Sequence, residues 1–203
     1  GKGTMTFPDG SKYAGDYAEG RRHGEGIFTL SDGSTYTGDF AKGRPHGEGT
    51  LIRPDGSKYE GYWKDGKRHG KGAVSRSDGF EYEGDFVKGK RHGTGIYTDP
   101  DGTKYDGDWE EGKEHGKGTL FRPDGSVGYK GDFVEGMAHG KGTLFRSDGS
   151  VQYKGDFVEG LAHGKGIFTF SNGAVLYDAD WVEGRPRGGG KIRWGAGGVG
   201  MRQ

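Results

Sequence analysis

Seven histidines are the side chains of this 203-residue sequence best suited to metal binding or proton transfer. They occupy one position of a repeated segment: His23, His46, His69, His92, His115, His139 and His163. A zinc site needs three or four ligands around one ion, with nitrogen about 2 Å from the metal. If the segments are β-hairpins laid side by side, equivalent histidines lie about 10 Å apart, so neighbours cannot share an ion. We therefore expect these histidines to form hydrogen bonds near hairpin tips, and a metal only where two chains meet.

Aspartates recur in the same way, three residues after a repeated tyrosine. They are Asp39, Asp85, Asp108, Asp132 and Asp156. A catalytic acid–base pair is a singular arrangement, so a carboxylate repeated in most segments indicates architecture. The segment 99–102 (Asp-Pro-Asp-Gly) lacks the remaining ligands of a calcium loop, and the glycines match neither a dinucleotide-binding nor a phosphate-binding loop. We expect no catalytic centre, no metal site and no cofactor.

The composition narrows the class of protein. The chain has 47 glycines, 6 prolines, 29% hydrophobic and 13% aromatic residues, no cysteine and a formal net charge of +0. So few aliphatic residues would indicate disorder unless the glycines belong to a periodic structure. The lack of cysteine excludes a disulfide scaffold, and the zero net charge argues against nucleic acid as a partner. No apolar run approaches a membrane span, and no N-terminal stretch resembles a signal peptide.

Tyrosine sets the period of the chain. Five tyrosines 23 residues apart are followed by three at intervals of 24: Tyr13, Tyr36, Tyr59, Tyr82, Tyr105, Tyr129, Tyr153 and Tyr177. This spacing predicts one repeat array over residues 1–203. It comprises a partial repeat at 1–12, seven full repeats at 13–176, and a divergent C-terminal repeat and cap at 177–203. Because the first residues match the middle of a repeat, the sequence looks like a piece of a longer array.

Each repeat is predicted to be one β-hairpin. Tyr59, Gly61 and Trp63 alternate along a strand. Residues 64–68 surround a glycine and are expected to form the tip, and residues 69–76 the return strand. An Asp-Gly turn then leads to the next hairpin. In the 24-residue repeats an extra residue follows Asp-Gly, where we expect a wider turn or a bulge.

Symmetric closure of this hairpin would pair Tyr59 with Val74, Gly61 with Gly72, and Trp63 with Gly70. The glycines leave room for aromatic rings to lie across the neighbouring backbone, which would replace an aliphatic core. The structural aromatic residues on this basis are Tyr36, Tyr59, Trp63, Tyr82, Tyr105, Trp109, Tyr129 and Tyr153. The expected fold is all-β, an elongated single twisted antiparallel sheet of consecutive β-hairpins.

The repeated string is Tyr-x-Gly-x-aromatic, then Gly, then His-Gly-x-Gly, then Asp-Gly. It resembles the MORN repeat (membrane occupation and recognition nexus) over essentially the whole chain. The match departs at Ala179, at Arg187 and at residues 188–194, where the pattern is expected to break. The resemblance implies a twisted β-sheet used as an interaction module. In that family the repeats occur attached to lipid kinases, methyltransferases and junctional membrane proteins, or alone as cytoskeleton-associated scaffolds, notably in protists.

These features lead to three functional hypotheses. The first is a non-enzymatic cytoplasmic scaffold for protein–protein interaction and self-association at the cytoskeleton or cell cortex. The second is a phosphoinositide-binding or anionic-membrane-binding module that uses basic hairpin tips. The third is a regulatory repeat region of a larger lipid kinase or methyltransferase. The His-Gly-x-Gly spacing argues against an extracellular repeat that binds choline or glycans.

The hairpin tips carry the charge contrast behind the second hypothesis. The first four tips are basic and the next three acidic, while the last is neutral. The basic residues are Arg21, Arg22, Arg44, Lys67, Arg68, Lys90 and Arg91. They are expected either to keep the protein soluble or to bind anionic lipid or an acidic partner. At about 10 Å spacing and a Debye length of about 8 Å, such sites act nearly separately, so membrane binding would need several repeats.

The C-terminal half suggests a partner surface. Met137-Ala138 and Leu161-Ala162 replace charged pairs at two tips. Exposed apolar residues and an unpaired sheet edge both favour association, unless these are simply tolerated surface residues. The candidate surface comprises Met137, Leu161, Tyr177, Trp181, Ile192 and Trp194. We expect a homodimer through the C-terminal repeats and cytoskeletal or membrane-associated protein partners, with phosphoinositides as the alternative ligand.

Overall fold

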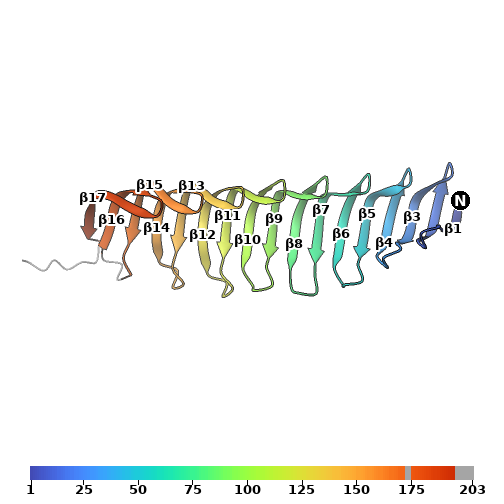
Figure 1. Cartoon of the computed structure of the whole chain (residues 1–203), viewed down its shortest axis with the longest axis horizontal. Coiled ribbons are helices and arrows are strands. Elements are labelled where there is room, and N and C mark those ends of the chain that lie inside the picture. Colours follow the sequence, from blue (N-terminus) through green and yellow to red (C-terminus); the bar gives the residue numbers. More distant parts are fainter. Residues whose placement is uncertain (172–174, 195–203) are drawn as a thin grey trace, which may run out of the picture. The chain divides into compact units, whose positions relative to one another are not determined.

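The computed structural model describes residues 1–171 and 175–194, where every helix or strand assigned is a β-strand (Figure 1). The chain forms two units, residues 1–101 and 102–203, which we describe in turn. In both units consecutive strands pair antiparallel, so the expected all-β architecture of successive hairpins is confirmed. Within the described residues there is no helix with the length and apolar character needed to cross a membrane.

The first unit contains nine strands. The first is a single return strand, and the other eight form four hairpins. They are β1 (Lys2–Thr6), β2 (Lys12–Ala18), β3 (Arg21–Thr29), β4 (Thr35–Ala41), β5 (Arg44–Ile52), β6 (Lys58–Lys64), β7 (Lys67–Ser75), β8 (Glu81–Val87) and β9 (Lys90–Thr98). The chain therefore opens on a return strand, as the sequence predicts.

The described residues of the second unit, 102–171 and 175–194, form eight strands in four hairpins. They are β10 (Lys104–Glu110), β11 (Lys113–Phe121), β12 (Val127–Val134), β13 (Met137–Phe145), β14 (Val151–Val158), β15 (Leu161–Thr169), β16 (Val175–Val182) and β17 (Arg185–Trp194). The strands of each unit alternate between a shorter outgoing strand that carries the repeated tyrosine and a longer return strand.

Each hairpin closes through a two-residue turn, which we call the tip. At Asp65-Gly66 both residues have positive φ, 51° and 82°, the conformation of a type I′ turn. A type I′ turn matches the right-handed twist of its flanking strands. Because these two residues alone connect the strands, the five-residue tip expected at 64–68 is wrong. Lys67 and Arg68 belong to β7 instead. The tip glycine also links neighbouring hairpins, because Gly66 N donates to Pro45 O at 2.8 Å.

The turns that connect successive hairpins use Asp-Gly. At residues 55–57 the Asp55 carboxylate accepts a hydrogen bond from Ser57 N at 2.8 Å, and Gly56 has a φ of 82°. In two of the 24-residue repeats the extra residue produces a register shift, next to Phe121 and next to Phe145, as expected. The third such turn includes residues 172–174, which lie outside the described part.

Two of the three predicted cross-strand pairs are confirmed. Tyr59 lies opposite Val74, and Gly61 lies opposite Gly72. These positions belong to the regular part of the hairpin, where alternation along both strands is uninterrupted. The simple symmetric closure therefore holds from the connecting turn up to the paired glycines.

The third predicted pair, Trp63 with Gly70, is wrong. The register shifts between Gly61 and Trp63, so Trp63 lies opposite Arg68. Gly70 instead pairs with Phe86 of the next hairpin and has a φ of 58°. This left-handed conformation favours glycine and accommodates the extra residue of the return strand.

The core of each repeat is a tyrosine packed on backbone. A Cβ atom placed on Gly72 would lie 2.4 Å from the Tyr59 hydroxyl oxygen, so only glycine fits beneath the ring. That hydroxyl donates to Tyr62 O at 2.9 Å. The Tyr59 ring makes edge contacts with Trp63 at 5.1 Å and with Phe86 of the next repeat at 5.3 Å between ring centroids. Such aromatic pairs contribute about 0.5–1.5 kcal/mol beyond the area that they bury.

The same arrangement recurs along both units. The buried aromatic residues include Tyr36, Tyr59, Trp63, Tyr82, Tyr105, Trp109, Tyr129 and Tyr153. We call the side of the sheet that carries them the aromatic face, and the other side the opposite face. Because each ring contacts its own hairpin and the next one, the packing is continuous within a unit without a second layer.

The last hairpin keeps more of the pattern than its sequence suggests. Gly190 N donates to the Tyr177 hydroxyl at 3.1 Å, so Gly190 occupies the place that Gly72 has beneath Tyr59. Gly188 has a φ of 78°, like the equivalent Gly70. The expected break at residues 188–194 is therefore wrong for the backbone, because the required glycines are present although the histidine is not.

Candidate functional site

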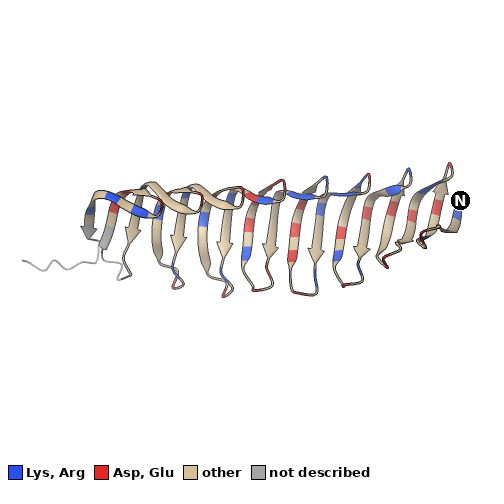
Figure 2. Ribbon diagram, in the orientation of Figure 1, with Lys and Arg blue, Asp and Glu red and all other residues tan. Residues whose placement is uncertain are grey.

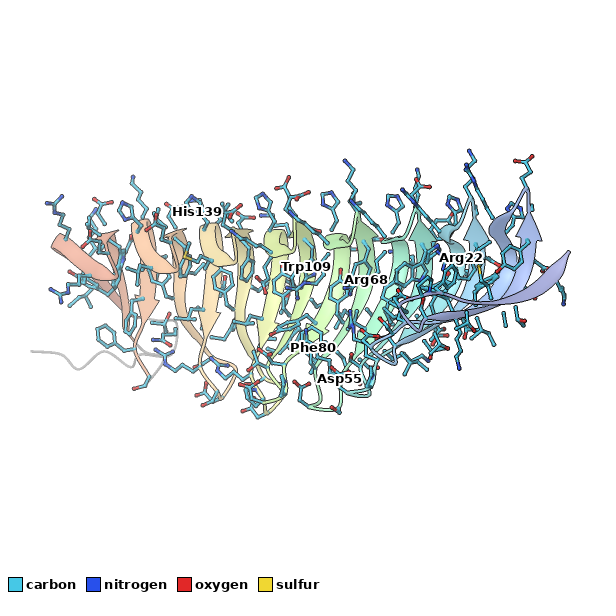
Figure 3. All side chains as sticks on the ribbon, turned by 45° about the vertical axis from the view of Figure 1, so that its right-hand side comes forward. Arg22, Asp55, Arg68, Phe80, Trp109 and His139 are labelled. Atoms are coloured by element: carbon cyan, nitrogen blue, oxygen red, sulfur yellow. The ribbon has the colours of Figure 1, made fainter. Side chains whose placement is uncertain are left out.

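Three of the seven predicted basic residues lie on the aromatic face. The Arg22 guanidinium carbon is 4.3 Å from the Phe28 ring centroid, and Nη2 donates to Gly43 O at 2.7 Å. Arg68 lies over Tyr59 at 5.4 Å, and burial lowers its pKa. Arg91 lies over Tyr82 at 5.6 Å. Figure 3 shows Arg22 and Arg68 over the sheet and away from its edge. These arginines therefore extend the aromatic packing. The sequence instead predicts them at the hairpin tips.

The other four basic residues are exposed beside the tips. Arg21, Arg44, Lys67 and Lys90 each begin a return strand of the first unit. Successive residues of a strand point to opposite faces, which separates Arg21, Lys67 and Lys90 from the arginines that follow them. The predicted strip of seven cations is therefore a row of four, with one cation in each repeat.

Two tips of the second unit are flanked by pairs of apolar residues. Val134 lies opposite Met137, and Val158 lies opposite Leu161. The four residues are 38%, 44%, 38% and 49% exposed, respectively. We call these four residues the apolar tip pairs. At the equivalent positions of one hairpin in the first unit, Lys64 lies opposite Lys67.

The other residues of the predicted partner surface differ in accessibility. Trp181 is buried and donates from Nε1 to Gly166 O at 3.0 Å, so it belongs to the core and cannot be offered to a partner. Tyr177 is half-buried beside Gly190. Ile192, on the last strand, is 61% exposed. Trp194 ends β17, but its side chain lies outside the described part.

The recurrent aspartates stabilise the opposite face. Asp132 forms an ion pair with Lys117 of the preceding strand, and its Oδ2 accepts from Lys141 N at 3.0 Å. The hydrogen bond from Lys117 is the main cause that lowers the pKa of Asp132. Asp156 repeats the arrangement with Lys141 and Lys165 N. These carboxylates are therefore held by the fold.

A groove of about 570 Å³ crosses the opposite face of the second unit. Its floor is the backbone at paired glycines such as Gly142 and Gly155. It is lined by four lysines, Lys130, Lys141, Lys154 and Lys165, together with Thr143, Ile167 and Asp178. We call it the lysine groove. Its chemistry suits an anionic ligand, and sequence reasoning missed it, although the lysines recur at fixed positions of two successive repeats.

The corresponding groove of the first unit has the other charge. Glu25, Asp39 and Glu48 line a groove of about 670 Å³ together with Lys2. Figure 2 shows the acidic residues as red bands in the middle of several strands of this unit. The two units therefore share a backbone architecture but present different electrostatics on the same face.

The histidines lie near the tips, as Figure 3 shows for His139. His115 Nε2 is 3.2 Å from Glu110 Oε2 across its hairpin, and His46 Nδ1 is 3.7 Å from Asp65 Oδ1. The Nδ1 atoms of both His46 and His92 are buried without a hydrogen-bond partner, so these two nitrogens do not take part in the predicted hydrogen bonding. Among the described residues, no group of three or more His, Cys, Asp or Glu side chains could hold a metal ion.

Comparison with solved structures finds distant similarities. The TCP domain of SAS-4 (dCPAP) from Drosophila melanogaster, solved with a proline-rich motif of Ana2 (dSTIL), is 14% identical, with a TM-score of 0.42 over 95% of this chain and 88% of that one. The TCP10 domain of CPAP from Danio rerio, as its E1021V mutant, is 13% identical, with a TM-score of 0.32 over 87% and 92%. Among curated proteins, none matches this chain.

Comparison with family models finds one family along the chain. The MORN repeat model matches nine consecutive segments: residues 1–12, 13–35, 36–58, 59–79, 82–104, 105–127, 129–151, 153–175 and 177–199. MORN repeats are modules that bind proteins or membranes and are generally non-catalytic. With its hairpins, its tyrosine-over-glycine packing and these nine matches, the chain belongs to the MORN repeat family.

Proposed function

We propose that this chain is a non-enzymatic scaffold that binds proteins at the cytoskeleton or cell cortex and self-associates through its C-terminal repeats. The observation that carries the proposal is the exposure of the apolar tip pairs in the second unit, Val134 with Met137 and Val158 with Leu161. They recur at the same position of two successive repeats, about 10 Å apart. Apolar groups exposed in register are typical of a protein-binding surface.

Folding does not account for these side chains. The core of each repeat consists of aromatic rings over glycine, and the apolar tip pairs lie beside the turns, outside that core. A cation occupies the position equivalent to Met137 and Leu161 in each of the other hairpins, as Lys67 and Lys90 do, so two successive cations are replaced by apolar side chains here. A second copy of the chain offers the same patch, and homodimers use such self-complementary surfaces. Ile192 on the last strand is a further exposed apolar residue, and it lies on the aromatic face, opposite Tyr177 in the register.

Light scattering tests the self-association. We expect the wild-type chain to be dimeric at tens of micromolar and a Met137→Glu/Leu161→Glu variant to be monomeric, because two charges would be buried without partners. An Ile27→Glu/Ile96→Glu variant is the control, since both residues are exposed apolar side chains of the first unit. A monomeric wild-type protein, or equal loss of dimer in both variants, contradicts the proposed surface. Enrichment in the detergent-insoluble cortical fraction of the source cell tests the location.

Membrane binding is the second candidate function. It is favoured by the row of exposed cations Arg21, Arg44, Lys67 and Lys90 at the tips of the first unit. Each cation near an anionic membrane contributes about 1 kcal/mol, so a row of four supports weak, salt-sensitive binding. Vesicle co-sedimentation tests it. Binding that ignores the content of anionic lipid, or that persists in about 0.5 M salt, would exclude this mechanism.

A further inference from the structure

We propose that the lysine groove on the opposite face of the second unit binds an extended acidic segment of a protein partner. This site goes beyond the scaffold surface proposed above, since it lies over the middle of the strands and uses ammonium groups, whereas the other surface lies beside the tips and uses apolar side chains. It is also distinct from the cationic row at the tips of the first unit.

The register of the strands places the lysines in a line. Thr143 of β13 lies opposite Lys130 of β12 on one side and opposite Lys154 of β14 on the other. Ile167 of β15 follows next to Lys154. Lys130 and Lys154 are therefore two strands apart, about 10 Å, with a threonine hydroxyl between them. Lys165 lies on the neighbouring row and lines the same groove.

The ammonium groups in this groove are not equally compensated. Lys141 forms an ion pair with Asp156 of the next strand, just as Lys117, outside the groove, does with Asp132. No ion pair of Lys130 or Lys154 is found in the described part of the chain, and both are exposed. Their charges are therefore available to a ligand, while the paired Lys141 stabilises the rim.

The spacing selects the kind of anion. The backbones of Lys130 and Lys154 are about 10 Å apart, so their side chains, standing side by side on the sheet, offer two separate ammonium groups to separate negative charges. A segment in the polyproline II conformation has three residues per turn and advances about 3.1 Å per residue, which places every third side chain on the same side and about 9 Å along the chain. A segment with carboxylates at that spacing lies across the strands, over the glycine floor, with one carboxylate for each lysine.

Comparison with the first unit shows that positive charge at these positions is specific to the lysine groove and is not a general feature of the repeat. The residues equivalent to Lys130 and Lys154 within their hairpins include Glu60 and Glu83. An acidic segment would be repelled there, although the backbone and the glycine pairs are the same. The lysine groove therefore sets both the location of the acidic segment and its register.

Fluorescence anisotropy with a defined peptide tests the proposal. The probe is a labelled peptide of about 15 residues, Gly-Ser-Glu repeated, and the reference peptide has glutamine in place of glutamate. The full chain should bind the glutamate peptide and not the glutamine peptide. A Lys130→Glu/Lys154→Glu variant should bind about tenfold more weakly, because two exposed ion pairs are replaced by repulsion. Lys64→Glu/Lys67→Glu, which changes the net charge equally at a tip, should bind like the wild type.

Several outcomes would overturn the proposal. One is equal weakening by both double variants, since it would mean that only overall charge matters. Another is the absence of peptide binding while vesicles with phosphatidylinositol bisphosphate bind and lose that binding in Lys130→Glu/Lys154→Glu, which would assign the groove to a lipid headgroup. Circular dichroism confirms that each variant is folded. Light scattering separates this site from the apolar tip pairs, because the lysine variants should keep the self-association of the wild type.

Discussion

The ring of Tyr129 covers Gly142 so closely that a Cβ atom on this glycine would lie 2.2 Å from the tyrosine hydroxyl oxygen. The ring also meets Phe133 of its own strand and Phe157 of the next repeat, both at 5.1 Å between centroids. One side chain thus closes its hairpin and joins it to its neighbour. The absence of a methyl group on Gly142 is therefore a structural requirement.

Gly142→Ala should lower the free energy of unfolding by about 2–3 kcal/mol, because the added methyl group must displace the ring. Gly142 does not have a left-handed φ, so the effect is steric and not conformational. Gly189→Ala is the matched control in the same unit, since nothing lies within 4 Å of its Cβ position. It should remain within about 0.5 kcal/mol of the wild type. Urea unfolding followed by circular dichroism measures both, and equal effects would contradict the packing argument.

Alkaline pH should destabilise the sheet through its buried tyrosines. Burial, followed by the nearby charge of Asp132, raises the pKa of Tyr129 to about 12 from a usual value of 10.0. A raised folded-state pKa means that the stabilisation is fully present below pH 10 and is lost as the pH rises toward 12. Tyr129→Phe loses the hydrogen bond to Asp132 O, about 1 kcal/mol at neutral pH, and should show a smaller decline above pH 10. The free energy of unfolding, measured for both proteins between pH 7 and about 12, tests this prediction. An equally steep decline in stability for the variant and the wild type would contradict it.

Acid should weaken the opposite face through its aspartates. The hydrogen bond and ion pair with Lys117 keep the pKa of Asp132 below its usual 3.8. A lowered folded-state pKa contributes stability above pH 3.8 that is lost as the pH falls through the folded value. Lys117→Met should therefore lose less stability on acidification than the wild type, whereas Lys130→Met should behave like the wild type because no aspartate among residues 1–171 and 175–194 forms an ion pair with Lys130. Thermal unfolding at a series of pH values from neutral to about 2 measures the difference, and identical slopes would refute it.

Arg68 and its neighbour Lys67 should respond differently to truncation. The Arg68 guanidinium carbon lies 5.4 Å from the Tyr59 ring centroid and 5.7 Å from that of Phe86, so Arg68→Ala should cost about 1 kcal/mol of stability. Lys67→Ala should change stability by less than about 0.5 kcal/mol, because this side chain is exposed. If the row of exposed cations binds anionic vesicles, Lys67→Ala should weaken that binding and Arg68→Ala should not. Urea unfolding and vesicle co-sedimentation of the two variants measure both effects.

Much of the fold follows from the repeat itself. The alternation of Tyr59, Gly61 and Trp63, with a fixed period, predicts consecutive hairpins, and the pair of Tyr59 with Val74 confirms the register near the connecting turn. These features depend on local alternation and on the size of glycine. Both are visible in one repeat of the sequence.

The tip could have been predicted more closely than it was. Asp65-Gly66 is a typical type I′ sequence, whose two residues close a hairpin without further loop. A shorter tip shifts the return strand, and this shift moves Arg68 onto the aromatic face and Gly70 toward the next hairpin. Symmetric closure of the hairpin does not include that shift. It therefore predicts that all the basic residues beside the tips point into solvent.

The lysine groove was missed for a different reason. Lys130 and Lys141 are 11 residues apart in the sequence and belong to the two strands of one hairpin, so their common groove emerges only once the register is known. The charge beside the tips, in contrast, is contiguous in the sequence and is visible without the register. The second unit therefore shows that charges in separate strands must be compared by face, and not by segment.

The hydrogen bond from the Gly66 amide to the Pro45 carbonyl reaches only to the adjacent hairpin. Its counterparts, such as Gly160 N to Ala138 O, do the same in the second unit. A chain built on such nearest-neighbour bonds can gain or lose whole hairpins by duplication or deletion without remaking the rest. Insertion of half a period, in contrast, would set every later tyrosine against the wrong strand.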